Sequence, residues 1–247
     1  MKQSDRNVIA DIAGGLRLLT RLPMRASDVI AGPGAAWAWP LAGAVVGGLA
    51  ALVGVVALPL GAGLAAALVL GAQAMMTGAM HEDGLADTAD GLWGGWDRAR
   101  RLEIMKDSHI GTYGVMALIV VSLIRWSALS ALLAAGGWFA LVAVAALSRV
   151  PMAVMLASLP NARGAGLSQS VGRVPPVSAA VAAMIGLAFA LGLGTAGLWA
   201  SFAVGLVSVA LALVAKAKIG GQTGDILGAS QQLAEAAALA VLAALLV

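Results

Sequence analysis

Three aspartates in this 247-residue sequence are spaced so that one face of a helix would carry all of them. Asp83, Asp87 and Asp90 stand at positions i, i+4 and i+7, so Asp87 and Asp90 lie roughly 40° and 20° from Asp83, on either side of it, around a helix. Carboxylates gathered in this way repel one another, and their natural partner is a hard divalent cation such as Mg²⁺ or Mn²⁺. Seven of the 12 acidic residues fall between Glu82 and Asp107, beside only four basic ones. We therefore favour a metal site over a solvated helix end.

The next segment mixes basic side chains with another aspartate. Arg98, Arg100 and Arg101 are followed by Lys106 and Asp107. Arginine and lysine can hold phosphate, the first as a planar fork and the second as a point charge. For the three arginines the simpler interpretation is a basic loop at the inner membrane face. Lys106 and Asp107 lie nearer the following apolar run and are the better candidates for a site.

A glycine-rich segment, residues 220–228, surrounds the single aspartate Asp225. Glycines let backbone N–H groups approach an anion closely, although the order of residues does not match a nucleotide-binding P-loop. Two arginines, Arg125 and Arg149, fall inside apolar runs, each roughly 15 Å from the same end of its helix. A charge at such a depth faces a polar cavity or a partner. We expect the two arginines to share an anion, either a phosphate or an aspartate, or to pair helices.

The elements that must position these groups are membrane-spanning helices. The chain is 61% hydrophobic and 11% charged, with a mean hydropathy of +0.94, whereas a soluble domain is about half apolar and about a quarter charged. About 20 apolar residues cross a bilayer as a helix. The sequence therefore predicts an all-α, polytopic membrane bundle that forms a single domain over residues 1–247. About seven spans are expected, at residues 34–57, 60–80, 114–135, 138–159, 177–199, 201–217 and 233–247.

Charge divides the connecting segments into two classes. The turns near residues 58–61, 135–138 and 195–201 carry no charge, while nearly every Lys and Arg lies in the N-terminal segment or near residues 81–113, 160–176 and 216–232. The positive-inside rule makes the charged segments cytoplasmic. We predict a protein of the bacterial cytoplasmic (inner) membrane whose active face is cytoplasmic. Apolar residues at helical spacing also predict an amphipathic helix over about residues 5–21, on the membrane surface or packed under the bundle.

The segments that carry this chemistry also resemble one known family. Residues 81–91 resemble the signature His-x-Asp-Gly-Leu-x-Asp-Thr-x-Asp-Gly of cobalamin synthase, the adenosylcobinamide-GDP ribazoletransferase family. The similarity extends over essentially the whole chain. It includes residues 102–108 with Gly111, Thr112 and Gly114, then Ser148, Arg149, Arg163, Gly164, Gly166 and Leu167, and finally residues 220–229 with Glu235.

The resemblance implies a reaction and a set of roles. In that family adenosylcobinamide-GDP is joined to α-ribazole or its 5′-phosphate, GMP leaves, and a divalent metal, usually Mg²⁺, is required. The roles expected here are catalysis by His81, Asp83, Lys106 and Asp107, substrate binding by Arg149, Arg163, Gly221, Thr223 and Gly224, and metal ligation by Asp83, Asp87, Asp90 and Asp225. We expect Asp225, Lys106 and Asp107 to converge on the first aspartates. The two substrates and the lipid bilayer are the expected partners, nucleic acid is not, and a homo-oligomer stays open.

Two other classes of membrane protein compete with this interpretation. A CDP-alcohol phosphotransferase also has clustered aspartates, but its signature needs Ala-Arg where Asp87 and Thr88 stand. A cation transporter would place acids near the bilayer midplane and would show an internal repeat; we see acids near one face and no convincing repeat. The absence of Cys excludes disulfides and Cys-ligated metal centres.

Overall fold

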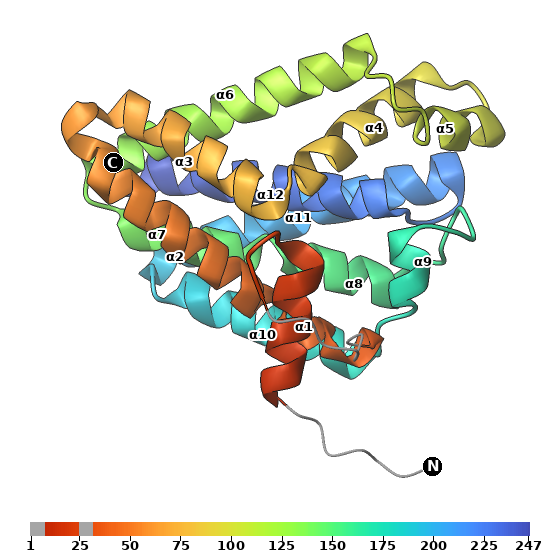
Figure 1. Cartoon of the computed structure of the whole chain (residues 1–247), viewed down its shortest axis with the longest axis horizontal. Coiled ribbons are helices and arrows are strands. Elements are labelled where there is room, and N and C mark those ends of the chain that lie inside the picture. Colours follow the sequence, from red (N-terminus) through yellow and green to blue (C-terminus); the bar gives the residue numbers. More distant parts are fainter. Residues whose placement is uncertain (1–7, 25–31) are drawn as a thin grey trace.

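The computed structural model describes residues 8–24 and 32–247, and every regular element in those ranges is helical. Long helices lie side by side in one bundle, and the short helix α1 runs across their direction (Figure 1). The α-helices are α1 (Val8–Leu19), α2 (Trp39–Ala57), α3 (Ala62–Thr77), α4 (Met80–Gly94), α5 (Arg98–Ile104), α6 (Thr112–Ala134), α7 (Trp138–Leu147), α8 (Val150–Ser158), α9 (Leu167–Val171), α10 (Pro176–Leu191), α11 (Gly194–Ile219) and α12 (Gly224–Leu246). Two 3-10 helices, η1 (Pro33–Ala38) and η2 (Leu58–Leu60), flank α2.

Five helical segments of the described chain are long and apolar enough to cross a bilayer. They are Pro33–Leu60, Thr112–Ala134, Trp138–Ser158, Gly194–Ile219 and Gly224–Leu246. The pair α3 and α4 makes a sixth if the two are one broken span, and α10, with 16 residues, is a shorter apolar helix. The prediction of a polytopic helical membrane protein is confirmed, and each of the seven predicted runs overlaps one of these apolar segments.

Two predicted boundaries at the C-terminal side were wrong. The predicted turn near residues 195–201 lies inside α11, which begins at Gly194 and continues to Ile219; the break falls at Gly192 and Leu193 instead. The last helix starts at Gly224, not near residue 233. The first error arises because small residues without charge do not distinguish a turn from a closely packed helix. The second arises because Asp225, Gln231 and Gln232 interrupt the apolar pattern inside the last helix.

A sharp bend between α3 and α4 was also missed. The predicted loop 81–113 contains two helices, and α3 and α4 meet at 91°. Two consecutive residues at the bend adopt left-handed backbone angles, Gly78 with φ 66° and Ala79 with φ 54°. A Cβ atom on Gly78 would lie 2.8 Å from Nε of Arg21, and the backbone N–H of Arg21 donates to the Met76 carbonyl oxygen (2.7 Å). The chain after α1 is therefore held against the bend.

Helix α1 covers part of the predicted amphipathic segment; residues 5–7 of that prediction lie outside the described residues. Gly14, Gly15 and Leu19 are buried, whereas Ile9 is exposed. The indole N–H of Trp37 donates to the Asp11 carboxylate (2.8 Å). A helix is therefore present in the predicted segment, and it is docked on the segment that leads into α2.

The charged connections gather at one end of the bundle. In Figure 1, α5, α9 and the junction of α11 with α12 lie at the right, while the turns after α2, α6 and α10 lie at the left with the C-terminus. This arrangement agrees with the two classes of connection that charge predicts, because the uncharged turns share one end and the charged segments share the other.

Candidate active site

Two glycines let α4 approach the start of α12 without intervening side chains. A Cβ atom on Gly84 would lie 2.8 Å from the carbonyl oxygen of Asp225, and one on Gly228 would lie 3.3 Å from the Cα atom of His81. Real Cβ atoms essentially never approach other atoms within 3.0 Å. The contact therefore depends on the two glycines, and it sets the Asp225 backbone against the turn of α4 that follows Asp83.

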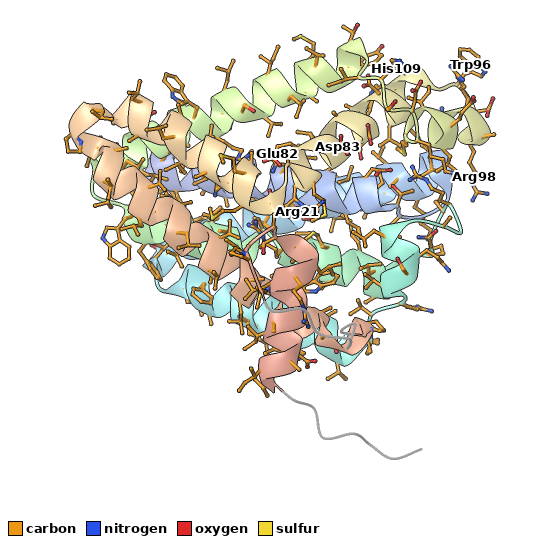
Figure 2. All side chains as sticks on the ribbon, in the orientation of Figure 1. Arg21, Glu82, Asp83, Trp96, Arg98 and His109 are labelled. Atoms are coloured by element: carbon orange, nitrogen blue, oxygen red, sulfur yellow. The ribbon has the colours of Figure 1, made fainter. Side chains whose placement is uncertain are left out.

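Three aspartates converge at this contact, as the sequence predicts. Asp83 is exposed on α4, and Asp87, one turn further along, is half-buried. The charge of Asp87 interacts with the negative charges of Asp225 and Asp83 and with the opposite charge of Arg163. Figure 2 shows Asp83 near the middle of the molecule, whereas Trp96 and His109 lie at its right-hand end. The acidic helix therefore begins near the middle of the bundle's length, not in a loop beyond the ends of the helices.

Asp90, the third predicted metal ligand on α4, makes a different set of contacts. One carboxylate oxygen accepts a hydrogen bond from the backbone N–H of Gly111 (2.7 Å), and the other accepts one from Gly114 (2.9 Å). The residue is 7% exposed. Its carboxylate thus caps the N-terminus of α6, where negative charge is favoured, and both glycines leave room for it.

Asp225 lies in the first turn of α12 and is held from two sides. Nη2 of Arg163 donates to its Oδ2 atom (2.7 Å), and the Thr223 hydroxyl donates to the same oxygen (3.2 Å). Thr223 also caps α12 by accepting from the Ile226 N–H (3.3 Å). Asn161 orders the loop that carries Arg163, because its Oδ1 atom accepts from the backbone N–H of Arg163 (3.0 Å).

The two glycines predicted to bind substrate lie in unlike surroundings. A Cβ atom on Gly221 would collide with the carbonyl oxygen of Pro160, so this position serves a close contact between backbones. At Gly224 a Cβ atom would meet nothing within 4 Å. Thr223 accepts from the N–H groups of Ile226 and Leu227, and no hydrogen bond of the described residues uses those of Gly224 and Asp225. These two donors at the start of a helix are suited to an anion.

Lys106 and Asp107 are not brought to the aspartates by any hydrogen bond or ion pair of the described residues. Both lie on an exposed turn after α5, and the Asp107 carboxylate is 2.6 Å from Nδ1 of His109. Hydrogen bonds from His109 lower the pKa of Asp107, and the hydrogen bond with Asp107 raises the pKa of His109 in turn. The electrostatic interaction of Asp87 with Asp225 supports the predicted convergence for Asp225, whereas for Lys106 and Asp107 the convergence stays a prediction.

The arginines after α4 bind backbone carbonyl groups. Arg98 donates to the carbonyl oxygens of Ile219 (2.8 Å) and Ala162 (3.1 Å), and Arg101 donates to that of Lys218 (3.1 Å) and to two others. Positive charge is favoured at the carbonyl end of a helix. These contacts match the interpretation of the arginines as part of an ordinary basic loop, since they join α5 to the end of α11.

His81, a predicted catalytic residue, faces an apolar cavity. The side chain is 1% exposed, and among the described residues neither ring nitrogen has a hydrogen-bond partner. Leu19, Trp39, Leu156 and Leu227 line the same cavity, while neither Asp83 nor Asp87 does. The structure thus gives the imidazole surroundings unlike those of the aspartates.

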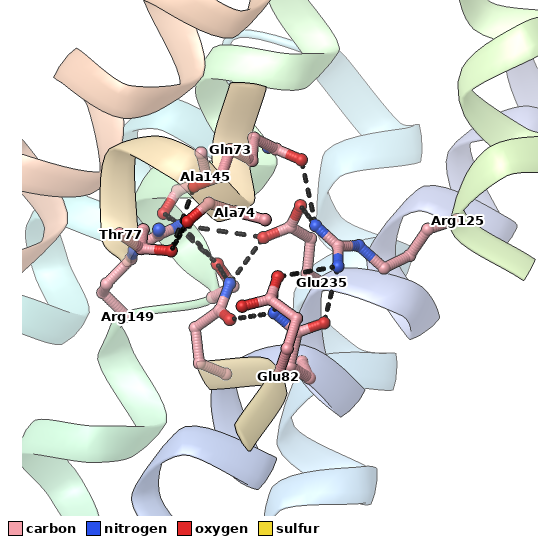
Figure 3. Close-up of polar contacts among 11 residues, drawn as sticks. Gln73, Ala74, Thr77, Glu82, Arg125, Ala145, Arg149 and Glu235 are labelled. Carbon is pink, nitrogen blue, oxygen red and sulfur yellow. Dashed lines mark hydrogen bonds and ion pairs between the residues drawn. The ribbon is translucent and has the colours of Figure 1, made fainter. Parts of the chain in front are cut away.

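Sequence reasoning missed a buried polar network that joins four helices (Figure 3). Arg125, 3% exposed on α6, donates to Gln232 (2.6 Å), Gln73 (2.9 Å) and Glu235 (2.9 Å), and it lies 3.5 Å from Glu82. No role was expected for Glu82, and the glutamines stand in apolar runs that do not signal a polar centre. The depth of Arg125 in a predicted span was the only signal.

Arg149 shares the same acidic partner. Its Nη1 atom lies 3.7 Å from Oε2 of Glu235 and donates to the Ala145 carbonyl oxygen (2.9 Å). The two arginines do share an anion, as expected, but it is the carboxylate of Glu235 and not a phosphate or an aspartate. Arg149 was predicted to contact substrate. In the structure it is 2% exposed and forms a buried ion pair with Glu235.

Known proteins resemble this chain over nearly its whole length. The sequence profile of the cobalamin-5-phosphate synthase family matches residues 11–243. The adenosylcobinamide-GDP ribazoletransferase of Bradyrhizobium diazoefficiens is 46% identical over 250 residues, which cover 97% of this chain and 95% of that protein. The enzyme of the same name from Mesorhizobium japonicum is 44% identical, with 96% of this chain and 94% of the relative covered. No solved structure matches the chain.

Proposed function

We propose that this chain, which belongs to the cobalamin-5-phosphate synthase family, joins adenosylcobinamide-GDP to α-ribazole or its 5′-phosphate with release of GMP. The product is adenosylcobalamin or its 5′-phosphate, so the enzyme is a transferase of cobalamin nucleotide-loop assembly. The observation that carries the site is the meeting of Asp83 and Asp87 on α4 with Asp225 at the start of α12.

The reaction exchanges one phosphate ester for another. A ribose hydroxyl of the ribazole attacks the phosphorus next to the corrinoid arm, the new P–O bond forms, and the P–O bond to GMP breaks. The hydroxyl proton leaves to a base, for which a carboxylate of the acidic cluster is suited by charge and exposure. Such transfers depend mainly on positioning and on neutralising phosphate charge.

The donor set suits Mg²⁺, which prefers oxygen ligands and completes its shell with water and substrate phosphates. Asp83, Asp87 and Asp225 would hold it, and the ion would offset the charge of the pyrophosphate. The described residues contain no ready-made group of three or more His, Cys, Asp or Glu ligands, and oxygens of the bound substrate would complete the coordination. Arg163 keeps Asp225 oriented, and Asp90 joins α4 to α6.

The open first turn of α12 gives a phosphate group a place beside these carboxylates. Its unpaired N–H groups and the helix dipole favour an anion, and no side chain fills the space over Gly224. We place this end of the bundle on the cytoplasmic side of a bacterial inner membrane, because the charged connections gather there.

Synthesis by the purified protein tests the proposal. Full-length protein in detergent is incubated with adenosylcobinamide-GDP, α-ribazole and Mg²⁺, and products are identified by mass. We expect adenosylcobalamin and GMP in equal amounts, with neither formed in EDTA. A parallel reaction with α-ribazole 5′-phosphate decides which acceptor is preferred. Release of nucleotide only from a CDP-alcohol, or no covalent product at all, contradicts the assignment.

A further inference from the structure

A second cavity adjoins the one that His81 lines, shares Leu156 and Ser168 with it, and lies at the charged end of the bundle. Its volume is about 290 Å³, and it is bounded by the end of α8, by α9 and by the segment before α12. The lining combines the apolar side chains of Leu156 and Leu159 with the polar groups of Gln222 and Arg173. A flat ring with polar edges suits such a lining, because its faces can contact the leucines while its edges form hydrogen bonds.

This cavity has two buried polar residues among those described: Ser168, whose hydroxyl accepts a hydrogen bond from Asn161 (2.9 Å), and Gln222. Only 2% of Gln222 is exposed, and its backbone is fixed on both sides: its N–H donates to the Pro160 carbonyl oxygen (2.9 Å), and its own carbonyl accepts from Ala162 (2.8 Å). Its side-chain Oε1 atom has no hydrogen-bond partner among the described residues. A buried acceptor without a donor is unfavourable and uncommon, so a ligand N–H group would satisfy it.

The parts of the two substrates differ in what they offer to such an acceptor. Guanine presents an N1–H group and a 2-amino group as donors, with O6 and N7 as acceptors that an arginine can contact. The benzimidazole base of a ribazole has a free ring nitrogen that accepts and no ring donor, so it would leave Oε1 unpaired. The corrin ring is far larger than the cavity.

We propose that this cavity receives the guanine ring of the GDP group, with the amide oxygen of Gln222 accepting hydrogen bonds from N1–H and the 2-amino group. The assignment rests on the proposed function, which supplies a guanosine diphosphate. Arg173 borders the cavity; its Nε atom donates to the Ala157 carbonyl oxygen (3.2 Å), and no hydrogen bond of the described residues uses its terminal nitrogens. Gln222 precedes Asp225 by three residues, so a base held here directs its phosphates toward the acidic cluster.

Nucleotide binding to the full-length protein in lipid nanodiscs tests this assignment. The probes are GMP, IMP, which lacks the 2-amino group, and AMP. We expect wild-type protein to bind GMP about tenfold more tightly than IMP, since IMP leaves one donor missing, and to bind AMP no better than IMP. Gln222→Leu should bind GMP and IMP alike, while Gln222→Glu, which keeps an acceptor, should still prefer GMP.

Gln169→Leu is the matched control, because Gln169 borders the same cavity but is exposed. It should keep the preference for GMP. Equal binding of GMP and IMP by wild-type protein overturns the assignment whether or not any variant folds, and so does a GMP preference that survives in Gln222→Leu. Either result leaves the proposed function intact if synthesis releases GMP. A guanine preference without any synthesis would instead contradict the function.

Discussion

Gly84 and Gly228 face each other across the contact of α4 with α12, where a Cβ atom on Gly84 would lie 3.1 Å from the Cα atom of Gly228. This contact unites two segments that are far apart in the sequence. The proposed site depends on it, because it brings the backbone of Asp225 against the turn of α4 that follows Asp83.

Gly84→Ala should separate the two helices. The added methyl group would lie 2.8 Å from the Asp225 carbonyl oxygen, and overpacking of this kind costs about 1–3 kcal/mol. We expect a lower midpoint of thermal unfolding in detergent and a loss of synthesis. Gly48→Ala is the control, because a Cβ atom there meets nothing within 4 Å; it should be neutral or slightly stabilising.

Removal of one carboxylate from the acidic cluster should abolish turnover and leave the fold intact. Asp83→Asn, Asp87→Asn and Asp225→Asn should each lower the rate by about 10³-fold or more, as expected for a lost metal ligand. Asp97→Asn is the control, since Asp97 caps α5 by accepting from the Arg100 N–H and asparagine caps a helix equally well. Normal turnover by Asp87→Asn would refute the metal site.

Asp90→Asn should behave differently from those three variants. An asparagine has one side-chain acceptor, so one of the N–H groups of Gly111 and Gly114 would lose its partner. We expect a loss of stability of about 1–3 kcal/mol, measured by chemical denaturation in mixed micelles. A variant that loses activity at unchanged stability would instead make Asp90 a metal ligand.

Ala79→Gly should stabilise the protein. Ala79 has φ 54° at the bend between α3 and α4, and a left-handed backbone costs a non-glycine residue about 1–2 kcal/mol. After the entropy cost of glycine, a gain of about 0.5–1 kcal/mol in the free energy of unfolding remains. Ala67→Gly, at an exposed position inside α3, should lower that free energy by about 1 kcal/mol. The same sign for both changes would contradict the strain at Ala79.

The ion pair of Arg125 with Glu235 should show strong coupling. Arg125→Met and Glu235→Gln each leave buried groups without their partners, at a cost of about 3–5 kcal/mol. The double variant should cost clearly less than the sum of the single costs, measured as free energies of unfolding in a double-mutant cycle. Additive costs would show that the two side chains do not stabilise each other.

The absence of Cys permits a direct test of topology. Single cysteines at Asp97, Ala165 and Lys216 should react with an impermeant thiol reagent from one side of the membrane. A cysteine at Ala135 should react from the other side only. All four positions are exposed. Labelling of Ala135 from the same side as the others would rule out the proposed orientation.

Charge and hydropathy predict most of the architecture because each span needs a long uncharged run. The spacing of Asp83, Asp87 and Asp90 correctly placed all three on one helix. It could not show that Asp90 turns to α6, since that depends on Gly111 and Gly114, 21 and 24 residues away. Nor could the spacing predict that Lys106 lies on an exposed turn, because closeness in the sequence does not determine the direction of a loop.

The bend at Gly78 and Ala79 cannot be predicted from hydropathy. No proline marks it, and alanine favours helix, so the pattern indicates a continuous helix or a simple loop. The polar network was hidden for a related reason. Gln73 and Gln232 lie in helices on opposite sides of Arg125 in the sequence, and only the packing of α3, α6 and α12 makes them partners.

The network around Arg125 has a consequence for how the protein is made. Arginine at the centre of a helix opposes membrane insertion by about 2.5–3.5 kcal/mol on translocon scales, and Arg125 lies midway along α6. Its acidic partner Glu235 is synthesised 110 residues later. During translation Arg125 therefore has Gln73 and Glu82, which precede α6 in the chain, as its first polar partners. The closer carboxylate of Glu235 reaches it only when α12 inserts, so insertion of the last helix would complete the network and fix α6 in place.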